Sequence, residues 1–321
     1  MTLKLRKDNA GLDKILDPSQ TLQIEAQGFT FIEGGVWNKQ KKSLIFNDIP
    51  ESKTYEYFPG QPPRLIRENT HKANGNAYDL DGNIVVCEHV RSCISKLDVQ
   101  TGDVRVLASH YEGKELNSPN DVVVKSNGVI FFTDPRFGRN PSWVGLEREQ
   151  ELDFQGVFSL YPKTGRLRLL CRDLDNPNGL CFSPDEQYLY INDPPKSHIR
   201  RFKVRLDGNL EEGTVFAITK GEGKGKPDGM KTDVEGNLYC CAQGGVHIFN
   251  KKGICLGVVK IPEQSGNCAF GGDDMKTLYV MATDKLYSFC ITTLIISKKP
   301  GNTGISRDIR TEFTTDLLLS D

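Results

Sequence analysis

The sequence has no long apolar run, no excess of one charge and no signal-like beginning. No stretch approaches the roughly 20 apolar residues that a membrane span needs, and residues 1–17 mix Lys, Arg and Asp without the apolar segment of a signal peptide. The 41 basic and 42 acidic side chains give a formal net charge of −1. This balance gives no electrostatic reason to expect binding to nucleic acid or to an anionic membrane. With 37% hydrophobic and 26% charged residues, the composition is typical of a globular protein.

Paired-cysteine motifs are also absent. The nine cysteines form no CxxC pair and no spacing that resembles a metal site. Several lie in apolar runs, among them Cys87, Cys240 and Cys241, and we interpret these as reduced thiols of the core. The odd number of cysteines and the lack of a secretion signal favour a reducing compartment. We therefore expect a cytoplasmic protein.

The motifs of several common catalytic sites are missing as well. The five histidines show no HxxxH or HxH spacing, which argues against a zinc site built on histidine. No GxSxG motif is present for a serine hydrolase. The glycine-rich stretch 221–226 lacks the Gly-Lys-Ser/Thr ending of a phosphate-binding loop, so we expect a surface loop there.

A repeated strand pattern is what the sequence does contain. Each copy begins with a polar residue at a bend and continues as an alternating strand, a turn and a second strand, as in residues 226–239. The copies open at residues 33, 76, 120, 178, 228 and 267, roughly 40–58 residues apart, which is the period of a four-stranded blade. No helical periodicity lasts beyond a turn or two.

These repeats predict an all-β fold, a six-bladed β-propeller with four-stranded blades, because radial closure leaves few exposed strand edges. An open solenoid would need capping repeats, and neither end of the sequence resembles one. We expect an N-terminal surface segment at 1–20, the propeller at 21–295 and a C-terminal tail at 296–321. The polar stretch 135–155 is longer than any other connection and is expected to form a lid or a rim loop.

The opening residues of the repeats are the candidate metal ligands. The inner strands of a propeller line the central channel, so opening residues far apart in sequence meet at one mouth. The carboxylates and amides of this set are all-oxygen ligands suited to a hard divalent cation: Glu33, Asn120, Asn178 and Asp228. Calcium is the first choice because it tolerates irregular geometry. Asn and Asp before Gly are also ordinary turn residues, but four polar openings at one repeat position, one of them a glutamate, favour a site.

One histidine also belongs among the candidates. His89 follows Cys87 and Glu88 on an expected inner strand. The alternative interpretation is a rim or core histidine with a hydrogen-bond partner and no part in chemistry.

Several segments resemble those of the SMP-30/gluconolactonase/luciferin-regenerating-enzyme family, with the bacterial-type gluconolactonases most similar. The resemblance covers roughly residues 20–290 and is carried by Glu33-Gly34-Gly35-Val36-Trp37, Gly75-Asn76-Ala77-Tyr78-Asp79, Cys87-Glu88-His89, Ser118-Pro119-Asn120-Asp121-Val122, Phe132-Thr133-Asp134-Pro135, Pro177-Asn178-Gly179-Leu180, Lys226-Pro227-Asp228-Gly229-Met230 and Asn267-Cys268-Ala269-Phe270-Gly271-Gly272. It implies a six-bladed propeller with a catalytic divalent ion, usually calcium. It places metal ligands at Glu33, Asn178 and Asp228, and a substrate or metal contact at Asn120.

This resemblance leads us to expect a metal-dependent lactonase acting on a sugar lactone such as gluconolactone. Asp228 is expected to orient or deprotonate the attacking water, and Asn120 and Asn76 to hold the lactone, with help from His89 or Asp134. Mg²⁺, Mn²⁺ and Zn²⁺ remain open as alternatives to Ca²⁺. Two other functions also remain open: a related metal-dependent ester or phosphotriester hydrolase, and a non-catalytic, calcium-stabilised propeller that binds a protein. The oligomeric state is left open.

Overall fold

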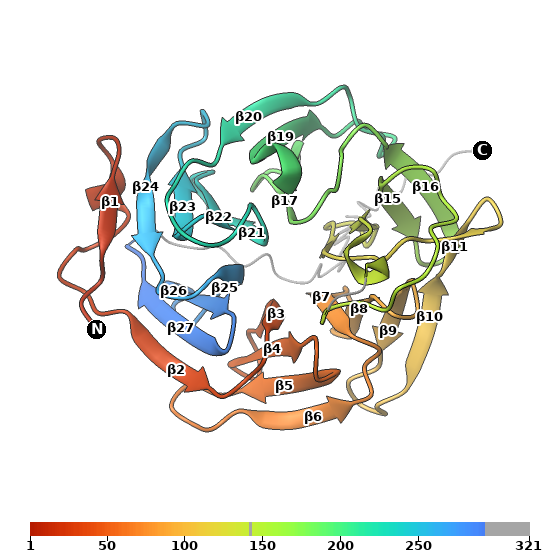
Figure 1. Cartoon of the computed structure of the whole chain (residues 1–321), viewed down its shortest axis with the longest axis horizontal. Helices are drawn as coiled ribbons and strands as arrows, with labels where there is room; N and C mark the ends of the chain where they lie inside the picture. The colour runs from red at the N-terminus through yellow and green to blue at the C-terminus, as the bar shows by residue number, and fades with distance from the viewer. Residues whose placement is uncertain (141–142, 293–321) are drawn as a thin grey trace, which may run out of the picture.

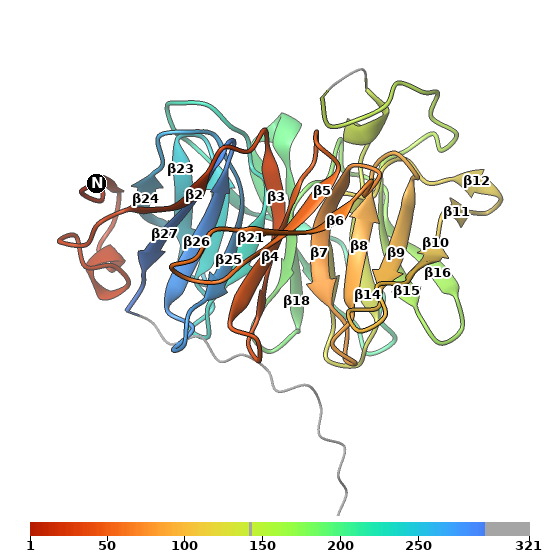
Figure 2. The same ribbon diagram turned by 90° about the horizontal axis from the view of Figure 1, so that it is seen from below.

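The computed structural model describes residues 1–140 and 143–292, and the expected tail at 296–321 lies outside them. Within the described residues, six antiparallel sheets stand around a central axis like the blades of a fan (Figure 1). The prediction of an all-β, six-bladed propeller is confirmed. Seen from the side, the inner strands begin at the upper face, which also carries the N-terminus and the long connection after β14 (Figure 2).

The first three blades follow one another along the chain. Blade 1 consists of β3 (Ile32–Asn38), β4 (Ser43–Asp48), β5 (Lys53–Tyr57) and β6 (Arg64–Glu68). Blade 2 consists of β7 (Ala73–Tyr78), β8 (Ile84–Glu88), β9 (Cys93–Leu97) and β10 (Val104–Ala108). After a small hairpin of β11 (His110–Tyr111) and β12 (Lys114–Glu115), blade 3 consists of β13 (Val122–Val124), β14 (Ile130–Asp134), β15 (Gly156–Tyr161) and β16 (Arg166–Cys171).

The other three blades close the ring. Blade 4 consists of β17 (Leu180–Phe182), β18 (Tyr188–Asp193), β19 (His198–Lys203) and β20 (Thr214–Ile218). Blade 5 consists of β21 (Met230–Thr232), β22 (Leu238–Ala242), β23 (Gly245–Phe249) and β24 (Cys255–Lys260). Blade 6 takes β25 (Ser265–Gly271), β26 (Thr277–Ala282) and β27 (Lys285–Cys290) from the end of the propeller and β2 (Gln23–Gln27) from its beginning. Three short 3₁₀ helices occur in the described residues: η1 (Leu12–Lys14), η2 (Phe137–Arg139) and η3 (Pro194–Lys196).

The N-terminal segment, residues 1–20, is an integral part of the propeller. Its strand β1 (Leu5–Lys7) pairs with β24 as a fifth strand of blade 5. Leu12 and Leu16 are fully buried in the apolar cluster between blades 5 and 6. The segment expected only to lie on the surface thus covers the edge of blade 5 with its strand and fills the gap between blades 5 and 6 with its apolar side chains.

Packing between adjacent blades forms the core. In the described part of the chain, six apolar clusters are found, one at each interface between neighbouring blades. The expected core thiols Cys87, Cys240 and Cys241 are fully buried, and none of the nine cysteines, all of which are described, forms a disulfide.

In blades 1, 3 and 4, the second strand ends in a buried aspartate that binds the loop before the inner strand. In each case its two carboxylate oxygens accept backbone N–H groups from the loop that leads into the inner strand, at 2.8 to 3.1 Å. These aspartates are Asp48, Asp134 and Asp193. Because a buried N–H without a partner is costly, the carboxylate fixes the place where each inner strand begins.

Candidate active site

The openings of the inner strands meet around the axis. The inner strands contact one another in the cyclic order β3, β7, β13, β17, β21, β25 and back to β3. Glu33 begins this circle, and Asn120, Asn178 and Asp228 stand at the openings of blades 3, 4 and 5. Glu33, Asn120 and Asn178 are buried, whereas Asp228 is partly exposed.

Glycines next to the opening residues allow this close approach: Gly179 follows Asn178, and Gly266 precedes Asn267. A Cβ on Gly179 would lie 2.1 Å from the backbone oxygen of Asp228 in the next blade. A Cβ on Gly266 would lie 1.9 Å from Oε1 of Glu33. Neither position has room for a side chain, so the backbones of neighbouring blades determine where both carboxylates lie.

The two carboxylates of the site are electrostatically unfavourable in the protein alone. Burial raises the pKa of Glu33 to about 8, although a hydrogen bond with the Asn267 side chain opposes the shift. Burial, followed by the charge of Glu33, raises the pKa of Asp228 well above its ordinary value, opposed by a hydrogen bond with the Asn178 side chain. A bound cation would offset the cost of ionising two buried carboxyl groups at one place.

Asn74, rather than the expected Asn76, holds the opening position of blade 2. The backbone oxygen of Asn74 faces Gly34 of blade 1, just as that of Asp228 faces Gly179. The Asn76 side chain instead donates to the Gly34 carbonyl at 2.8 Å and links blades 1 and 2. The pair Asn74-Gly75 has the same form as Glu33-Gly34, so this sequence signal was available and was missed.

His89 holds two amides of the site. Its Nδ1 lies 2.9 Å from the Val144 carbonyl, which can only accept, so Nδ1 carries the proton. Its Nε2 therefore accepts from Nδ2 of Asn74 at 3.2 Å, and Nδ2 of Asn120 lies at 3.5 Å. Burial lowers the pKa of His89 to about 4, so the ring is neutral near neutral pH. His89 thus determines how the Asn74 and Asn120 amides are turned.

Asp134 lies at the end of β14 with both oxygens occupied by backbone N–H groups of Asn117 and Ser118. Burial raises its pKa to about 7. Through these contacts Asp134 holds the loop before the inner strand of blade 3. Its expected contact with substrate stays a prediction.

Near the inner strands, sequence reasoning missed a lysine, Lys231, whose Nζ donates to the Met230 carbonyl at 3.1 Å and whose charge Asp121 stabilises. Burial lowers the pKa of Lys231, but Asp121 and neighbouring thiols raise it more, so the net shift is upward. Asp121 in turn accepts backbone N–H groups from Val122 at 2.9 Å and from Leu180 at 3.3 Å. A lysine between Met230 and Thr232 on an inner strand was the available signal, because a charge there must face the channel.

The described parts of the long connection, 135–140 and 143–155, lie at the same mouth. The ring of Trp143 meets the Phe31 ring edge-on, with centroids 4.4 Å apart, and its carbonyl accepts from Lys72 Nζ at 2.6 Å. Behind it, the buried Arg139 guanidinium donates to the Asn117 carbonyl at 2.7 Å and anchors η2. The described parts of this connection lie at the rim, and a role as a lid stays a prediction.

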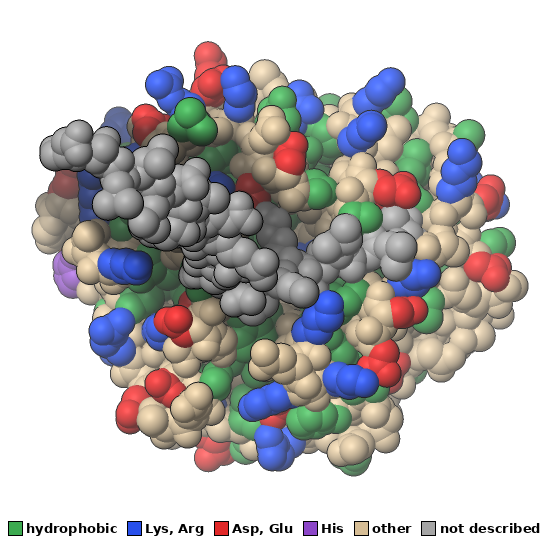
Figure 3. Space-filling model, turned by 180° about the vertical axis from the view of Figure 1, so that it is seen from behind, with side chains coloured by type: hydrophobic (Ala, Val, Ile, Leu, Met, Phe, Trp, Pro, Cys, Tyr) green, Lys and Arg blue, Asp and Glu red, His purple; other side chains and the backbone are tan. Residues whose placement is uncertain are grey.

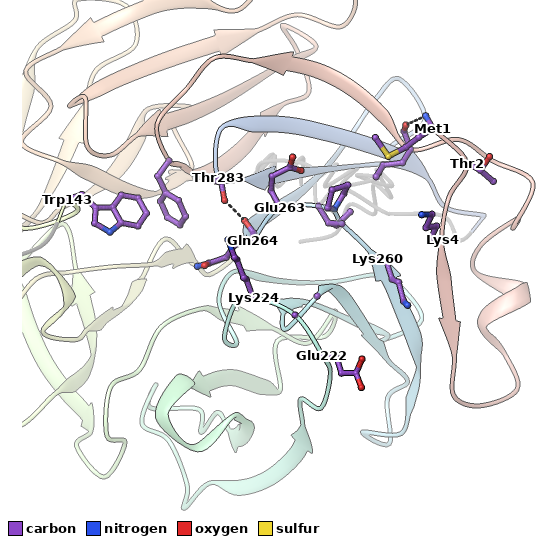
Figure 4. A pocket seen from close by; sticks show the side chains of 16 residues that line it. Met1, Thr2, Lys4, Trp143, Glu222, Lys224, Lys260, Glu263, Gln264 and Thr283 are labelled. Carbon is purple, nitrogen blue, oxygen red and sulfur yellow. Dashed lines mark hydrogen bonds between the residues drawn. The ribbon is translucent and has the colours of Figure 1, made fainter.

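A cavity of about 690 Å³ opens beside Phe31 and Trp143. Figure 4 shows Trp143 at one end of it, with Lys224 and Gln264 next along the wall. Phe31 connects this cavity with Glu33, because Gly266 faces both the Phe31 ring and Oε1 of Glu33.

The arrangement defines a class: a six-bladed propeller with a buried carboxylate and amide site at one mouth of its channel. The sequence profile of the SMP-30/gluconolactonase/LRE-like region matches residues 31–284, and the chain therefore belongs to this family.

Individual relatives agree with this assignment. A gluconolactonase from Zymomonas mobilis is 33% identical over 304 residues, covering 87% of this chain and 84% of the relative. Regucalcin from Xenopus laevis is 29% identical over 268 residues, covering 80% and 84%. The solved structure of a gluconolactonase from Xanthomonas campestris superposes with a TM-score of 0.83 at 32% identity, covering 89% of this chain and 94% of that one. This kinship identifies the enzyme class as lactonase.

Three further observations concern the possible metal ligands, the helices and the opposite face. No three His, Cys, Asp or Glu side chains of the described residues converge on a point, so a cation at the axis needs amide oxygens as well as Glu33 and Asp228. No helix in the described part of the chain is long and apolar enough to span a bilayer. On the face opposite the mouth, basic and acidic side chains are interspersed wherever they are visible (Figure 3).

Proposed function

We propose that the protein opens the ring of an aldonolactone, with gluconolactone as the first substrate to test, at a divalent cation held on the propeller axis. The observation that carries the proposal is the pair of carboxylates, Glu33 and Asp228, beside amide side chains. Burial raises both pKa values, and the charge of Asp121 adds to the shift of Glu33 and that of Glu33 to the shift of Asp228. The relatives of known name support the choice of substrate class.

The donor set fits a hard cation. Glu33 and Asp228 would supply charge, and Asn178 and Asn120 would supply neutral oxygens, which is the mixture that calcium accepts and that magnesium uses less often. When bound, such an ion polarises the lactone carbonyl and offsets the negative charge that develops on its oxygen, an effect worth several kcal/mol.

The protein's own residues perform the remaining steps. Asp228, partly exposed at the mouth, orients a water molecule and accepts its proton as the water oxygen attacks the carbonyl carbon. The bond from that carbon to the ring oxygen then breaks, and the ring oxygen receives the proton that Asp228 accepted, which returns Asp228 to its ionised form. The product is the open hydroxy acid, so one water is consumed for each ring opened.

Binding and orientation fall to the amides and to the loop above them. Asn120 is oriented by neutral His89 and is placed to hold the lactone, and Asn76 on blade 2 is the second candidate for this contact. Phe31 and Trp143 cover the mouth and limit the access of bulk water. Holding the reactants in one geometry is itself a large part of such catalysis.

The test is turnover by protein freed of metal with EDTA and then reloaded with calcium. Loaded wild type should hydrolyse gluconolactone well above the spontaneous rate, and stripped protein should not. A panel of aldonolactones, homoserine lactones and organophosphates distinguishes the lactonase from an ester or phosphotriester hydrolase.

Asp228→Asn should abolish turnover with folding intact, and the exposed Asp207→Asn serves as its control. Equal rates for stripped and loaded wild type would rule out the metal mechanism. Loss of folding alone in Asp228→Asn would favour a structural ion.

A further inference from the structure

The cavity beside the active site has one aromatic end and one basic end. Figure 4 shows Trp143 at the inner end, Lys224 farther along, and Lys4 and Lys260 at the outer end. The volume of about 690 Å³ lies within the range of roughly 300–1,000 Å³ that is typical of small-molecule sites. The cavity therefore has room for a substituent that extends beyond a lactone ring held at the axis.

The three lysines of this cavity are exposed, and no described residue forms an ion pair with any of them. Two glutamates also line the cavity. Glu263 is already paired with Lys285 at 2.6 Å and accepts from the Tyr287 hydroxyl, whereas Glu222 is exposed. With Glu263 neutralised by Lys285, the lining has a surplus of positive charge that this chain does not balance itself.

We propose that this basic groove, lined by Lys4, Lys224 and Lys260, binds an anionic group of the substrate, so that the preferred lactone carries a phosphate or a carboxylate away from its carbonyl. The inference rests on the proposed function. With the carbonyl at Glu33 and Asp228, this cavity would lead the rest of the substrate past Phe31 toward the lysines. Lys224 is placed for a short substituent, and the outer two lysines add to the attraction along the groove.

The test compares kcat/KM for three lactones on calcium-loaded protein, corrected for spontaneous hydrolysis: glucono-1,5-lactone, its 6-phosphate and a glucaric acid monolactone. Wild type should favour the anionic lactones. Lys224→Gln and Lys260→Gln should each lower kcat/KM for them about two- to fivefold, mainly through KM, as expected for exposed ion pairs. The neutral lactone should be unaffected, and added salt should reduce the preference.

Lys252→Gln is the matched control, because Lys252 precedes β24 whereas Lys260 ends it, and both side chains are exposed. A larger effect with the phosphate identifies a phosphorylated lactone, and equal effects identify an anion of either kind. If the neutral lactone is hydrolysed but the lysine variants treat all three substrates as wild type does, the groove proposal is wrong and the proposed function stands. If wild type hydrolyses no lactone, both are wrong.

Discussion

Gly266 of blade 6 lies against Glu33 of blade 1 so closely that a Cβ on Gly266 would stand 1.9 Å from Oε1 of Glu33. The two residues are more than two hundred positions apart, and they meet because β25 is the neighbour of β3 in the closed ring. The position of one candidate metal ligand is thus set by the backbone of the last blade. When the ring closes between blades 6 and 1, the same contact puts the Glu33 carboxylate in its place in the site.

Gly266→Ala is expected to push the Glu33 carboxylate out of place. Calcium affinity should fall at least about tenfold, because a ligand displaced by an ångström or more no longer completes the coordination sphere. Calorimetric titration of calcium into the stripped variant measures the effect, and Glu33→Gln provides the reference for complete loss of this ligand. Wild-type affinity in a folded Gly266→Ala protein would contradict the assignment of Glu33.

The sequence was sufficient for the fold because each blade repeats one local pattern. Turn residues and alternating strands at a regular spacing leave few ways to bury six sheets, and the polar openings at Glu33, Asn120, Asn178 and Asp228 identified the mouth. Register was harder to read. Bulges in β7 and β25 shift the pairing by one residue, so Asn74 takes the opening position that the alternating pattern assigned to Asn76.

Long-range pairing was beyond what a local pattern can reveal. Asp121 and Lys231 belong to different blades, and nothing in either segment names the other as its neighbour. Likewise, Leu12 and Leu16 are spaced as in many surface segments, and their burial follows only from the gap between blades 5 and 6. The contacts of His89 with Val144 and Asn74 depend on how the long loop packs, which its polar sequence leaves undetermined.

Glu33→Gln should stabilise the metal-free protein. The pKa of Glu33 is raised to about 8 in the folded state, above its ordinary value of 4.5. The folded protein therefore binds this proton more tightly than the unfolded chain does, and between these two values stability falls as pH rises. Glutamine removes that cost, which at pH 8 is on the order of a few kcal/mol. Urea unfolding in EDTA at pH 6 and pH 8 measures it.

The variant and wild type should differ more at pH 8 than at pH 6. With calcium present the order should reverse, because wild type gains the binding free energy and the variant does not. A variant that is less stable than wild type in EDTA at pH 8 would show that the carboxylate is already satisfied by Asn267 and needs no cation.

Calcium binding should release protons. The raised pKa values of Glu33 and Asp228 mean that at least one of these groups carries a proton near neutral pH in the metal-free protein. A cation binds the ionised forms, so affinity should rise with pH through the raised pKa of each group, which for Glu33 is about 8. Titrations in buffers of different ionisation enthalpy give the number of protons released. A count of zero at pH 6.5 would mean that both carboxylates are ionised without metal.

Leu16→Ala tests the part that the N-terminal segment plays in the fold. Leu16 is fully buried between blades 5 and 6, so the truncation should cost about 2–5 kcal/mol of unfolding free energy. The fully exposed Leu206 provides the control, and Leu206→Ala should change stability by less than about 0.5 kcal/mol. Chemical denaturation of both variants decides the matter. Equal stabilities would mean that the segment lies on the ring without supporting it.

His89→Ala should slow catalysis without altering its dependence on pH. Burial lowers the pKa of His89 to about 4, so the ring is already neutral throughout the range above pH 5 and has no proton to exchange there. The effect of the substitution comes through Asn120, whose amide loses its orienting partner. Losing a partner behind a residue of the site typically lowers activity about 10- to 100-fold.

His247→Ala is the matched control. His247 is also buried with a lowered pKa, but it bonds to the Gln243 carbonyl in blade 5, so its loss should affect stability alone. The measurement is kcat/KM for gluconolactone from pH 5 to 9 in all three proteins. A parallel, lowered profile for His89→Ala supports a positioning residue. The disappearance of one limb of the profile would show instead that His89 itself transfers a proton.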